Sequence, residues 1–224
     1  MNIPPLDIRL NVGPFNDEAS FLDWGKFEFD RLVKYGNMTE NSSVLDLGCG
    51  CGRIALHCTD YLKKGSYEGI DTLKTLIDWC KQNIQYSNFK FSHIDVHSER
   101  YNLGGIQASK VSLPFEDNSF DLVFAISLFT HMFQADMSRY FKEVARILRP
   151  SGRLYATYFF SRDSTSKADS TGDESMIVYR EKVVLQLLNS AKLFQSYIEY
   201  GNWDRGAPQA FTPFQDTLVV QKQS

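Results

Sequence analysis

The sequence predicts an α/β fold in which a doubly wound, mostly parallel sheet carries helices on both faces. Short apolar runs suited to buried strands alternate along the chain with helical patterns, which is typical of such a sheet. One of these runs, Val44–Leu47, leads directly into the glycine-rich segment Gly48–Gly52 and then into a helical pattern. The chain has 224 residues, enough for one domain with a full hydrophobic core. We therefore expect residues 1–224 to form a single domain.

The composition excludes several classes of protein. Hydrophobic residues make up 43% and charged residues 23%, which argues against wholesale disorder or a fibrous repeat. The net charge of -3, without any cluster of Lys and Arg, argues against binding to a phosphate backbone. No apolar run approaches the roughly 20 residues of a membrane span, and the N-terminus lacks the apolar core of a signal peptide. We expect a cytoplasmic protein without nucleic-acid or membrane partners, and the sequence leaves its oligomeric state open.

The predicted elements follow one another in a regular order. Apolar residues recur at helical spacing over residues 17–35, which predicts an amphipathic N-terminal helix. Continuous apolar runs predict strands buried on both faces, and helical patterns separate them. The predicted strands are Val44–Leu47, Tyr67–Ile70, Phe89–Val96, Leu122–Ile126, Arg153–Phe160, Phe194–Trp203 and Thr217–Val220. The further predicted helices are Arg53–Leu62, Leu73–Ile84, Asp136–Leu148 and Tyr179–Leu193.

Turn-forming residues mark the connections between these elements. Pro150–Gly152 predicts a turn before the fifth strand. Ser161–Ser175 is rich in Ser, Thr, Asp and Lys and almost without apolar residues, which predicts a mobile loop, either a lid or a connector. A loop containing Gly and Pro splits the last two strands, which suit a hairpin at the sheet edge.

The glycine-rich segment Gly48–Gly52 lies between a strand and a helix, where a glycine backbone can approach a ligand closely. A dinucleotide-binding fingerprint requires its third glycine at position 53, where this chain has Arg53, so a dehydrogenase is disfavoured. Asp71 ends the next predicted strand, where a carboxylate can accept the hydroxyls of a ribose. The alternative is that Asp71 only caps the helix that begins at Leu73.

These segments resemble the motifs of class I S-adenosylmethionine-dependent methyltransferases, over about Leu32–Phe160. Val44–Gly52 is similar to the first motif of that family and Gly69–Asp71 to the second. Its later landmarks are matched by Leu113–Phe115, Ser119–Val123 and Leu148–Arg153. The resemblance implies a seven-stranded, mostly parallel sheet with an antiparallel last strand. It also implies S-adenosylmethionine as the cofactor and S-adenosylhomocysteine as its product.

Cofactor contacts follow from the resemblance position by position. It implies that Asp46 and the glycine loop face the methionine part and that Asp71 holds the ribose, which suits a ligand with an ammonium and a sulfonium group. In the family an acidic residue often precedes the Leu-Pro-Phe landmark by a few positions, but here Ser109 occupies that place. We therefore expect adenine contacts from Asp95 and Val96, before an insertion over residues 98–111. The expected cofactor-binding residues are Asp46, Leu47, Gly48, Cys49, Gly50, Gly52, Asp71, Thr72, Asp95, Val96 and Ile126.

His131 is the candidate general base. Methyl transfer is a displacement at an activated sulfonium, so alignment and exclusion of water supply much of the rate. Many acceptors still have to lose a proton, and histidine suits that task near neutral pH. His131 follows the fourth predicted strand, where the carboxyl ends of strands build the ligand crevice. The alternative is that His131 only forms hydrogen bonds within its loop.

A metal site is not expected. His93, Asp95 and His97 alternate along the third predicted strand, but core packing, cofactor contact and loop exposure explain them without a metal. The four cysteines lack the spacing of a zinc site or of a disulfide framework. We expect small buried or loop thiols there.

Two groups of aromatic residues have alternative roles. Phe15, Trp24 and Phe27 can cover the cofactor or an apolar substrate, with the N-terminal helix as a candidate lid, although their helical spacing favours core positions. Trp203 and Arg205 either line the acceptor pocket or belong to an ordinary hairpin turn.

The function expected from these features is methylation of a small-molecule acceptor at oxygen. Nitrogen and carbon acceptors remain open, because loop variation lets one fold host all of them. A DNA amino-methyltransferase is disfavoured because Ala125–Leu128 stands where such enzymes require an Asn/Asp-Pro-Pro-Tyr/Phe segment. The alternative from another class is a scaffold or activator that binds the cofactor without catalysis.

Overall fold

The computed structural model describes residues 2–163, 168–205 and 212–223. The helices are α1 (Leu6–Arg9), α2 (Glu18–Lys34), α3 (Ala55–Cys58), α4 (Lys74–Asn83), α5 (Gln134–Ile147) and α6 (Glu181–Ser190), with 3-10 helices η1 (Leu10–Val12), η2 (Ala108–Lys110) and η3 (Phe129–His131). The strands are β1 (Ser43–Leu47), β2 (Ser66–Asp71), β3 (Phe89–His93), β4 (Phe120–Ala125), β5 (Leu148–Phe160), β6 (Ser170–Asp173), β7 (Met176–Tyr179), β8 (Leu193–Glu199) and β9 (Asp216–Lys222). No helix among these residues is both long and apolar enough to cross a membrane.

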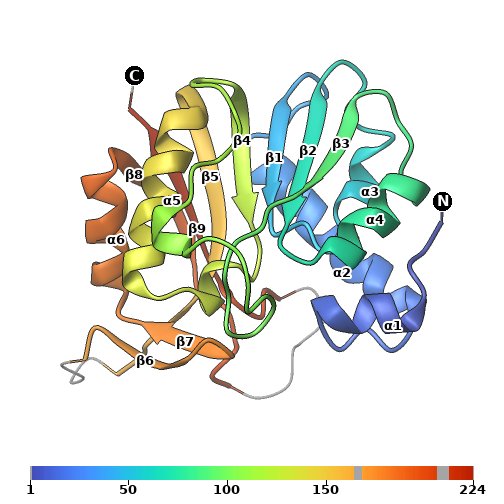
Figure 1. Ribbon diagram of the computed structural model, residues 1–224. Helices are drawn as coiled ribbons and strands as arrows, with labels where there is room; N and C mark the ends of the chain where they lie inside the picture. The colour runs from blue at the N-terminus through green and yellow to red at the C-terminus, as the bar shows by residue number, and fades with distance from the viewer. Residues whose placement is uncertain (1, 164–167, 206–211, 224) are drawn as a thin grey trace.

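The predicted doubly wound α/β fold is confirmed (Figure 1). Strands β3, β2, β1, β4 and β5 are neighbours in that order, and all their pairings are parallel. The last strand, β9, pairs antiparallel with both β5 and β8, as the family resemblance implied. The sheet has nine strands within the described residues, because β6 and β7 add a hairpin to the seven expected strands. The hairpin joins the sheet where β7 pairs with the end of β5.

Two hydrophobic cores lie on opposite faces of the sheet. Side chains alternate along each strand, so Val44 belongs to one core and its neighbour Leu45 to the other. In β4 the neighbours Val123 and Phe124 divide in the same way. Helices α2, α3 and α4 cover one face, and α5 and α6 cover the other. Burial on both faces explains why the central strands are continuously apolar.

The N-terminal helix predicted over residues 17–35 is confirmed as α2. Asp17 caps it by accepting a hydrogen bond from the backbone N of Ser20 at 2.7 Å. Near its other end, Arg31 anchors the helix to the sheet. The guanidinium donates from Nε to the hydroxyl of Tyr155 and from Nη2 to that of Thr217, both at 2.8 Å.

The predicted helix Arg53–Leu62 is wrong in length, because only Ala55–Cys58 forms an α-helix. Gly52 has a φ of +77°, and its backbone N donates to the carbonyl of Cys49 at 3.0 Å. The glycine loop therefore ends in tight turns that delay the helix. Turns also replace the predicted last residues of the helix.

The third and fifth strands also differ from prediction. β3 ends at His93 rather than at Val96, and Val96 instead bridges to Ile106 in the insertion. β5 begins at Leu148, upstream of the predicted turn Pro150–Gly152. The predicted turn forms a bulge within β5 instead. The pairing of β5 with β4 shifts its register at this point, between Phe120 and Leu122 of β4.

The predicted mobile loop Ser161–Ser175 contains β6, which pairs antiparallel with β7. Residues 164–167 lie outside the described residues. The predicted helix from Tyr179 starts at Glu181 instead, because Ile177 and Tyr179 are buried as alternate residues of a strand. The hydroxyl of Tyr179 donates to the carbonyl of Met132 at 2.8 Å, which ties the hairpin to the loop after β4.

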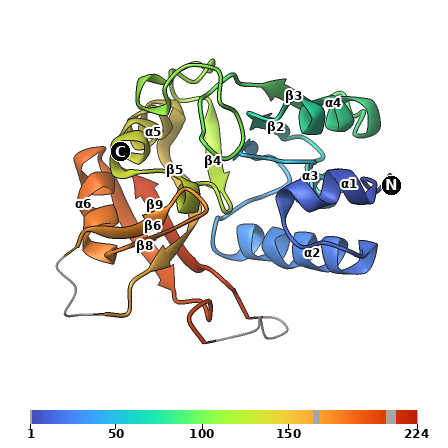
Figure 2. The same ribbon diagram turned by 60° about the horizontal axis from the view of Figure 1, so that its bottom comes forward.

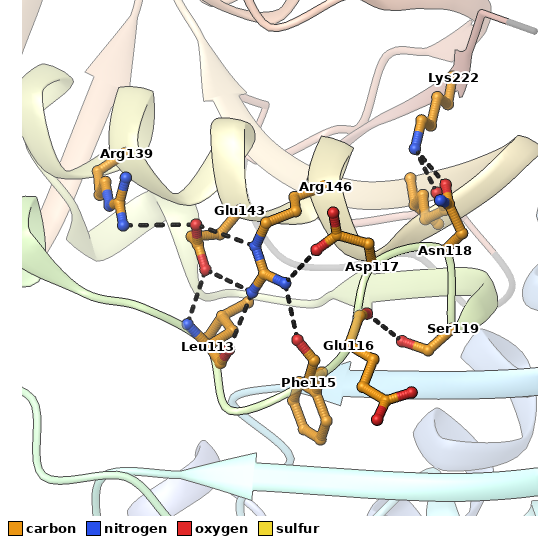
Figure 3. Close-up of polar contacts among 11 residues, drawn as sticks. Leu113, Phe115, Glu116, Asp117, Asn118, Ser119, Arg139, Glu143, Arg146 and Lys222 are labelled. Carbon is orange, nitrogen blue, oxygen red and sulfur yellow. Dashed lines mark hydrogen bonds and ion pairs between the residues drawn. The ribbon is translucent and has the colours of Figure 1, made fainter.

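The segment before β4, residues 113–119, is fastened to α5 by Arg146 (Figure 3). This guanidinium donates to the carbonyls of Leu113 at 2.9 Å and Phe115 at 2.7 Å. Glu143 accepts from the same guanidinium and from the backbone N of Leu113, both at 2.8 Å. This segment contains Leu113–Phe115 and the beginning of Ser119–Val123, two of the motifs that resemble the family, and it leads into β4. This end of the strand is opposite to the one that builds a ligand crevice.

Candidate active site

A cavity of about 570 Å³ lies at the carboxyl ends of the parallel strands. This volume falls within the range of roughly 300–1,000 Å³ typical of small-molecule sites. The arrowheads of β1 and β4 point toward this edge in Figure 1, and Figure 2 shows α1 and the β6–β7 hairpin on its two sides. Loops after β1, β2 and β4 supply the floor, together with Phe159 near the end of β5. Further walls come from Leu10–Pro14, the insertion after β3 and the turn Glu174–Met176.

Positive φ angles shape the glycine loop between β1 and α3. Gly48 and Gly50 have φ values of +78° and +55° and line the cavity. A Cβ atom on Gly50 would lie 2.4 Å from Cγ1 of Val12, so glycine lets η1 close over the loop. Gly52 does not line the cavity, and a Cβ there would lie 2.6 Å from Cδ1 of Ile84. Gly52 therefore allows the chain to pack closely against Ile84 beneath the loop.

Asp71 joins the end of β2 to the glycine loop. Its Oδ2 accepts a hydrogen bond from the backbone N of Gly50, and its Oδ1 accepts one from that of Leu73, both at 2.8 Å. Burial raises the pKa of Asp71 above its usual value, and these hydrogen bonds lower it. The alternative prediction, that Asp71 only caps the next helix, holds in part. Asp71 accepts from the backbone N of Leu73, but Leu73 rather than Asp71 is the N-cap of α4. Each carboxylate oxygen keeps a further acceptor site toward the cavity.

Asp46 lies on the same wall and is almost fully buried. The hydroxyl of Tyr67 donates to its Oδ2 at 2.5 Å. Burial raises the pKa of Asp46 to about 7, although the hydrogen bond from Tyr67 lowers it. A positively charged ligand group in the cavity would favour the ionised carboxylate.

Only some of the residues expected near the adenine of the cofactor line the cavity. Thr72 and Val96 line the cavity, and the hydroxyl of Thr72 donates to the carbonyl of Val96 at 2.8 Å. Asp95 does not line the cavity: its exposed carboxylate accepts from the side-chain amide of Asn102 at 2.8 Å. β3 has already ended at His93, so the alternation expected along a longer strand does not apply. Ile94, which was not expected in the site, lines the cavity instead.

Apolar groups complete the cofactor side of the cavity. Leu47, Cys49 and Ile126 line it as expected. The four cysteines are buried and free. Burial raises the pKa of the Cys51 thiol to about 12, so this side chain stays a neutral packing group.

His131 lies at the end of η3 and lines the cavity. Its Nδ1 is 2.7 Å from the backbone carbonyl oxygen of Glu174, in the turn between β6 and β7. A carbonyl can only accept, so Nδ1 carries a hydrogen and Nε2 of the neutral ring keeps its lone pair. Burial lowers the pKa of His131, which favours the neutral ring near pH 7. The ring of Tyr101 packs edge-on against it, with centroids 5.7 Å apart.

His93 and His97, the two histidines that alternate with Asp95 along the predicted third strand, make separate contacts. His93 contacts the carbonyl of Thr72 through Nε2 at 3.1 Å. His97 lines the cavity and bonds to the carbonyl of Leu103 and to Glu99. Over residues 2–163, 168–205 and 212–223, no three His, Cys, Asp or Glu side chains gather as a metal site would require.

The aromatic candidates also lie outside the cavity lining. Phe15 packs edge-on against Phe21, and Trp24 packs edge-on against Phe27. No residue of α2 lines the cavity, which η1 covers instead.

The late-loop candidates Trp203 and Arg205 do not line the cavity either. Trp203 packs against Phe159 and donates from Nε1 to Asp216 at 2.9 Å. Arg205 is exposed, and part of the loop that follows it lies outside the described residues.

Several lining residues were missed because they are distant in sequence or lie in segments without a motif. The turn-rich stretch before α2 was the only available signal for η1, and nothing marked the β6–β7 turn. The lining residues in these segments and elsewhere that were not anticipated include Leu10, Asn11, Val12, Arg53, Arg100, Tyr101, Asp136, Tyr140, Glu174 and Gln215.

The strand order, the glycine loop and the two carboxylates beside it, those of Asp46 and Asp71, define the fold and ligand pocket of a class I methyltransferase. Comparison with known proteins agrees: the profile of the methyltransferase domain family matches residues 45–156. The chain belongs to this family.

Individual relatives are more distant. A phthiotriol/phenolphthiotriol dimycocerosates methyltransferase from Mycobacterium ulcerans is 30% identical over 159 residues, which cover 69% of this chain and 49% of the relative. The chain thus spans about half the length or less of the first curated relatives that it matches. A S-adenosylmethionine-dependent methyltransferase from Methanosarcina mazei has a TM-score of 0.61 at 22% identity, covering 85% of this chain and 97% of that structure. The [4+2]-cyclase SpnF has a TM-score of 0.65 at 18% identity, covering 98% and 92%. At these identities the structures show the fold alone.

S-adenosylmethionine is the cofactor that the family implies, and the cavity fits it. Gly48, Cys49 and Gly50 all line the cavity, so the loop backbone lies within reach of a ligand there. Asp71 would hold the ribose hydroxyls, and Asp46 would face the amino-acid end. Ile94 and Val96 would supply an apolar wall for adenine.

Proposed function

We propose that the protein transfers a methyl group from S-adenosylmethionine to a small-molecule acceptor, with His131 as the general base. The observation that carries this proposal is the fixed tautomer of His131 inside the cavity that contains Asp71 and the glycine loop. When bound, S-adenosylmethionine supplies a methyl group already activated on sulfur. The chain itself then has to orient the acceptor, exclude water and remove one proton.

An oxygen acceptor suits this arrangement best. Nε2 of the neutral ring can accept the proton of a hydroxyl while that oxygen takes the methyl group. The imidazolium then returns the proton to solvent. The ring keeps its orientation throughout, because Nδ1 stays bonded to the carbonyl of Glu174. Amine and carbon acceptors also release a proton, so the same base serves them as alternatives.

A small acceptor is favoured by the enclosure of the site. The β6–β7 turn reaches the insertion, where the hydroxyl of Ser98 donates to Glu174 at 3.0 Å. The cavity must hold both the cofactor and the acceptor within about 570 Å³. The net charge of -3 also offers no broad basic surface for a polynucleotide.

Transfer of labelled methyl from S-adenosylmethionine into extracts of the native host, followed by mass identification of the product, tests this proposal. His131→Gln should lower kcat by about 10²- to 10⁴-fold, the usual contribution of a general base. S-adenosylhomocysteine should bind the variant within about twofold of wild type, because the base contributes to proton transfer rather than to cofactor binding. His93→Gln, at an exposed histidine outside the cavity lining, is the matched control and should keep full activity.

A cofactor-binding scaffold without catalysis is the competing function. Its signature would be tight binding of S-adenosylhomocysteine together with no labelled product from any extract. Equal turnover by wild type and His131→Gln would instead support methyl transfer but show that His131 is not the general base.

A further inference from the structure

Arg100 lies in the insertion after β3, where it is exposed and lines the cavity. Its guanidinium lies over the ring of Tyr101, with 5.2 Å from Cζ to the ring centroid. The same ring packs edge-on against His131, with the two ring centroids 5.7 Å apart. Tyr101 therefore contacts both a permanent positive charge and the proposed base.

The guanidinium of Arg100 has no anionic partner in the protein. Apart from its contact with the ring, it forms no hydrogen bond or ion pair in the described part of the chain. The carboxylates at the β6–β7 turn, which contacts the insertion, have other partners. Asp173 accepts from the backbone N of Ser175 at 2.8 Å. Glu174 accepts from the hydroxyl of Ser98 at 3.0 Å. The N–H donors of Arg100 are thus available to a ligand in the cavity.

The charge of Arg100 opposes proton transfer to the proposed base. Burial lowers the pKa of His131, the hydrogen bond to the carbonyl of Glu174 raises it, and the charge of Arg100 lowers it. The carboxylate of Glu174 has an opposite effect that is smaller than that of Arg100. When His131 takes a proton, two cations face the same end of the cavity. An anion held by Arg100 would offset this repulsion and make the proton transfer easier.

We infer that Arg100 binds an anionic group of the acceptor, which is then a hydroxy compound that also carries a carboxylate or a phosphate. This inference rests on the proposed function. The fork of N–H donors on a guanidinium matches the oxygens of both groups. The hydroxyl oxygen bonds to the methyl carbon as the carbon–sulfur bond of the cofactor breaks, and the hydroxyl proton passes to Nε2 of His131. The anionic group takes part in no bond change, so the product keeps its negative charge.

The charge of the methylated product tests this inference. Purified protein is incubated with labelled S-adenosylmethionine and an ultrafiltrate of host extract, which supplies small acceptors without other enzymes. The labelled product should bind to an anion-exchange resin near neutral pH, whereas unreacted S-adenosylmethionine, a cation, passes through. Alkaline phosphatase then distinguishes the two sources of charge, because it releases the charged group of a phosphate ester but leaves a carboxylate intact.

Variants of Arg100 test whether this residue recognises the charge. At low acceptor concentration, Arg100→Met should slow label incorporation by about 10- to 100-fold, as for a lost hydrogen bond to a charged group. Arg100→Lys keeps the charge without the fork, so its rate should be intermediate. Both variants should bind S-adenosylhomocysteine within about twofold of wild type, which also shows that they are folded. Lys110→Met is the matched control, because it removes a positive charge from the same insertion outside the cavity lining, and it should keep the wild-type rate.

A labelled product that passes through the resin, or a wild-type rate in Arg100→Met, would overturn the inference while leaving methyl transfer intact. Binding of S-adenosylhomocysteine that weakens in step with the rate would also overturn it, because Arg100 would then serve the cofactor. No labelled product from wild type would contradict the proposed function, and the inference with it.

Discussion

The phenol of Tyr67 on β2 donates a hydrogen bond to Oδ2 of Asp46 on β1, at 2.5 Å, and both side chains are buried. Burial raises the pKa of the Asp46 carboxyl to about 7, and this hydrogen bond keeps it from rising further. The cavity wall at Asp46 therefore changes charge near neutral pH. Stability and ligand binding should both respond to that titration.

Tyr67→Phe should lower the free energy of unfolding by about 1–2 kcal/mol, because Asp46 loses a buried hydrogen bond. The pKa of Asp46 should rise further, so binding of S-adenosylhomocysteine at pH 7 should weaken. Urea denaturation and titration calorimetry measure the two effects. Tyr86→Phe, at a half-exposed tyrosine, is the control and should change neither. Wild-type stability and affinity in Tyr67→Phe would show that the hydrogen bond contributes nothing.

The raised pKa of Asp46 also predicts how stability depends on pH. Between about pH 4 and pH 7 the native protein holds a proton that the unfolded chain has lost, so this group's stabilisation disappears as the pH rises. The slope for one proton is at most about 1.4 kcal/mol per pH unit. Asp46→Asn should therefore lose less stability than wild type on going from pH 5 to pH 8. Parallel pH profiles for the two proteins would contradict the assigned shift.

Gly52→Ala should destabilise the protein by about 1–3 kcal/mol, through a left-handed backbone and overpacking. The φ of Gly52 is +77°, and the new Cβ would lie 2.6 Å from Cδ1 of Ile84. Gly104→Ala is the control, because its nearest neighbour, Oδ1 of Asn102, lies at 3.4 Å. Urea denaturation of both variants provides the comparison, and similar losses would remove the special role of Gly52.

Arg146→Met should lower the free energy of unfolding by about 1–3 kcal/mol, because Glu143 and two carbonyls lose their donor. Affinity for S-adenosylhomocysteine should stay unchanged, since none of residues 113–119 lines the cavity. Lys142→Met, at the exposed neighbour of Glu143, controls for loss of a positive charge on α5. An altered affinity in Arg146→Met alone would mean that this segment reaches the site after all.

The sequence predicted the parts of the site that depend on local order. A buried strand, Gly48–Gly52 and an acid at the end of the next strand are fixed by short spacings, and Gly48, Gly50 and Asp71 line the cavity as expected. His131 follows β4 closely and lines the same cavity. Its role as a base remains a proposal.

Long-range contacts could not be predicted in this way. The carbonyl that fixes the tautomer of His131 belongs to Glu174, 43 residues away, in a polar stretch that was expected to be a loop. Asp95 was expected in the site in place of the acidic residue that the family carries before Leu-Pro-Phe, but β3 ends at His93 and the Asp95 carboxylate lies outside the cavity lining. Arg53 served only to exclude a dinucleotide site, and its place in the cavity lining is visible only once the neighbouring segments are placed.

Titration calorimetry with S-adenosylhomocysteine measures whether Asp71 and the glycine loop form the site for S-adenosylmethionine. Wild type should bind, and Asp71→Asn should weaken binding by at least about tenfold, as for loss of hydrogen bonds to a charged group. Asp95→Asn should bind like wild type, because its carboxylate lies outside the cavity lining. No binding to wild type, or equal affinities for wild type and Asp71→Asn, would show that Asp71 and the glycine loop do not form this site.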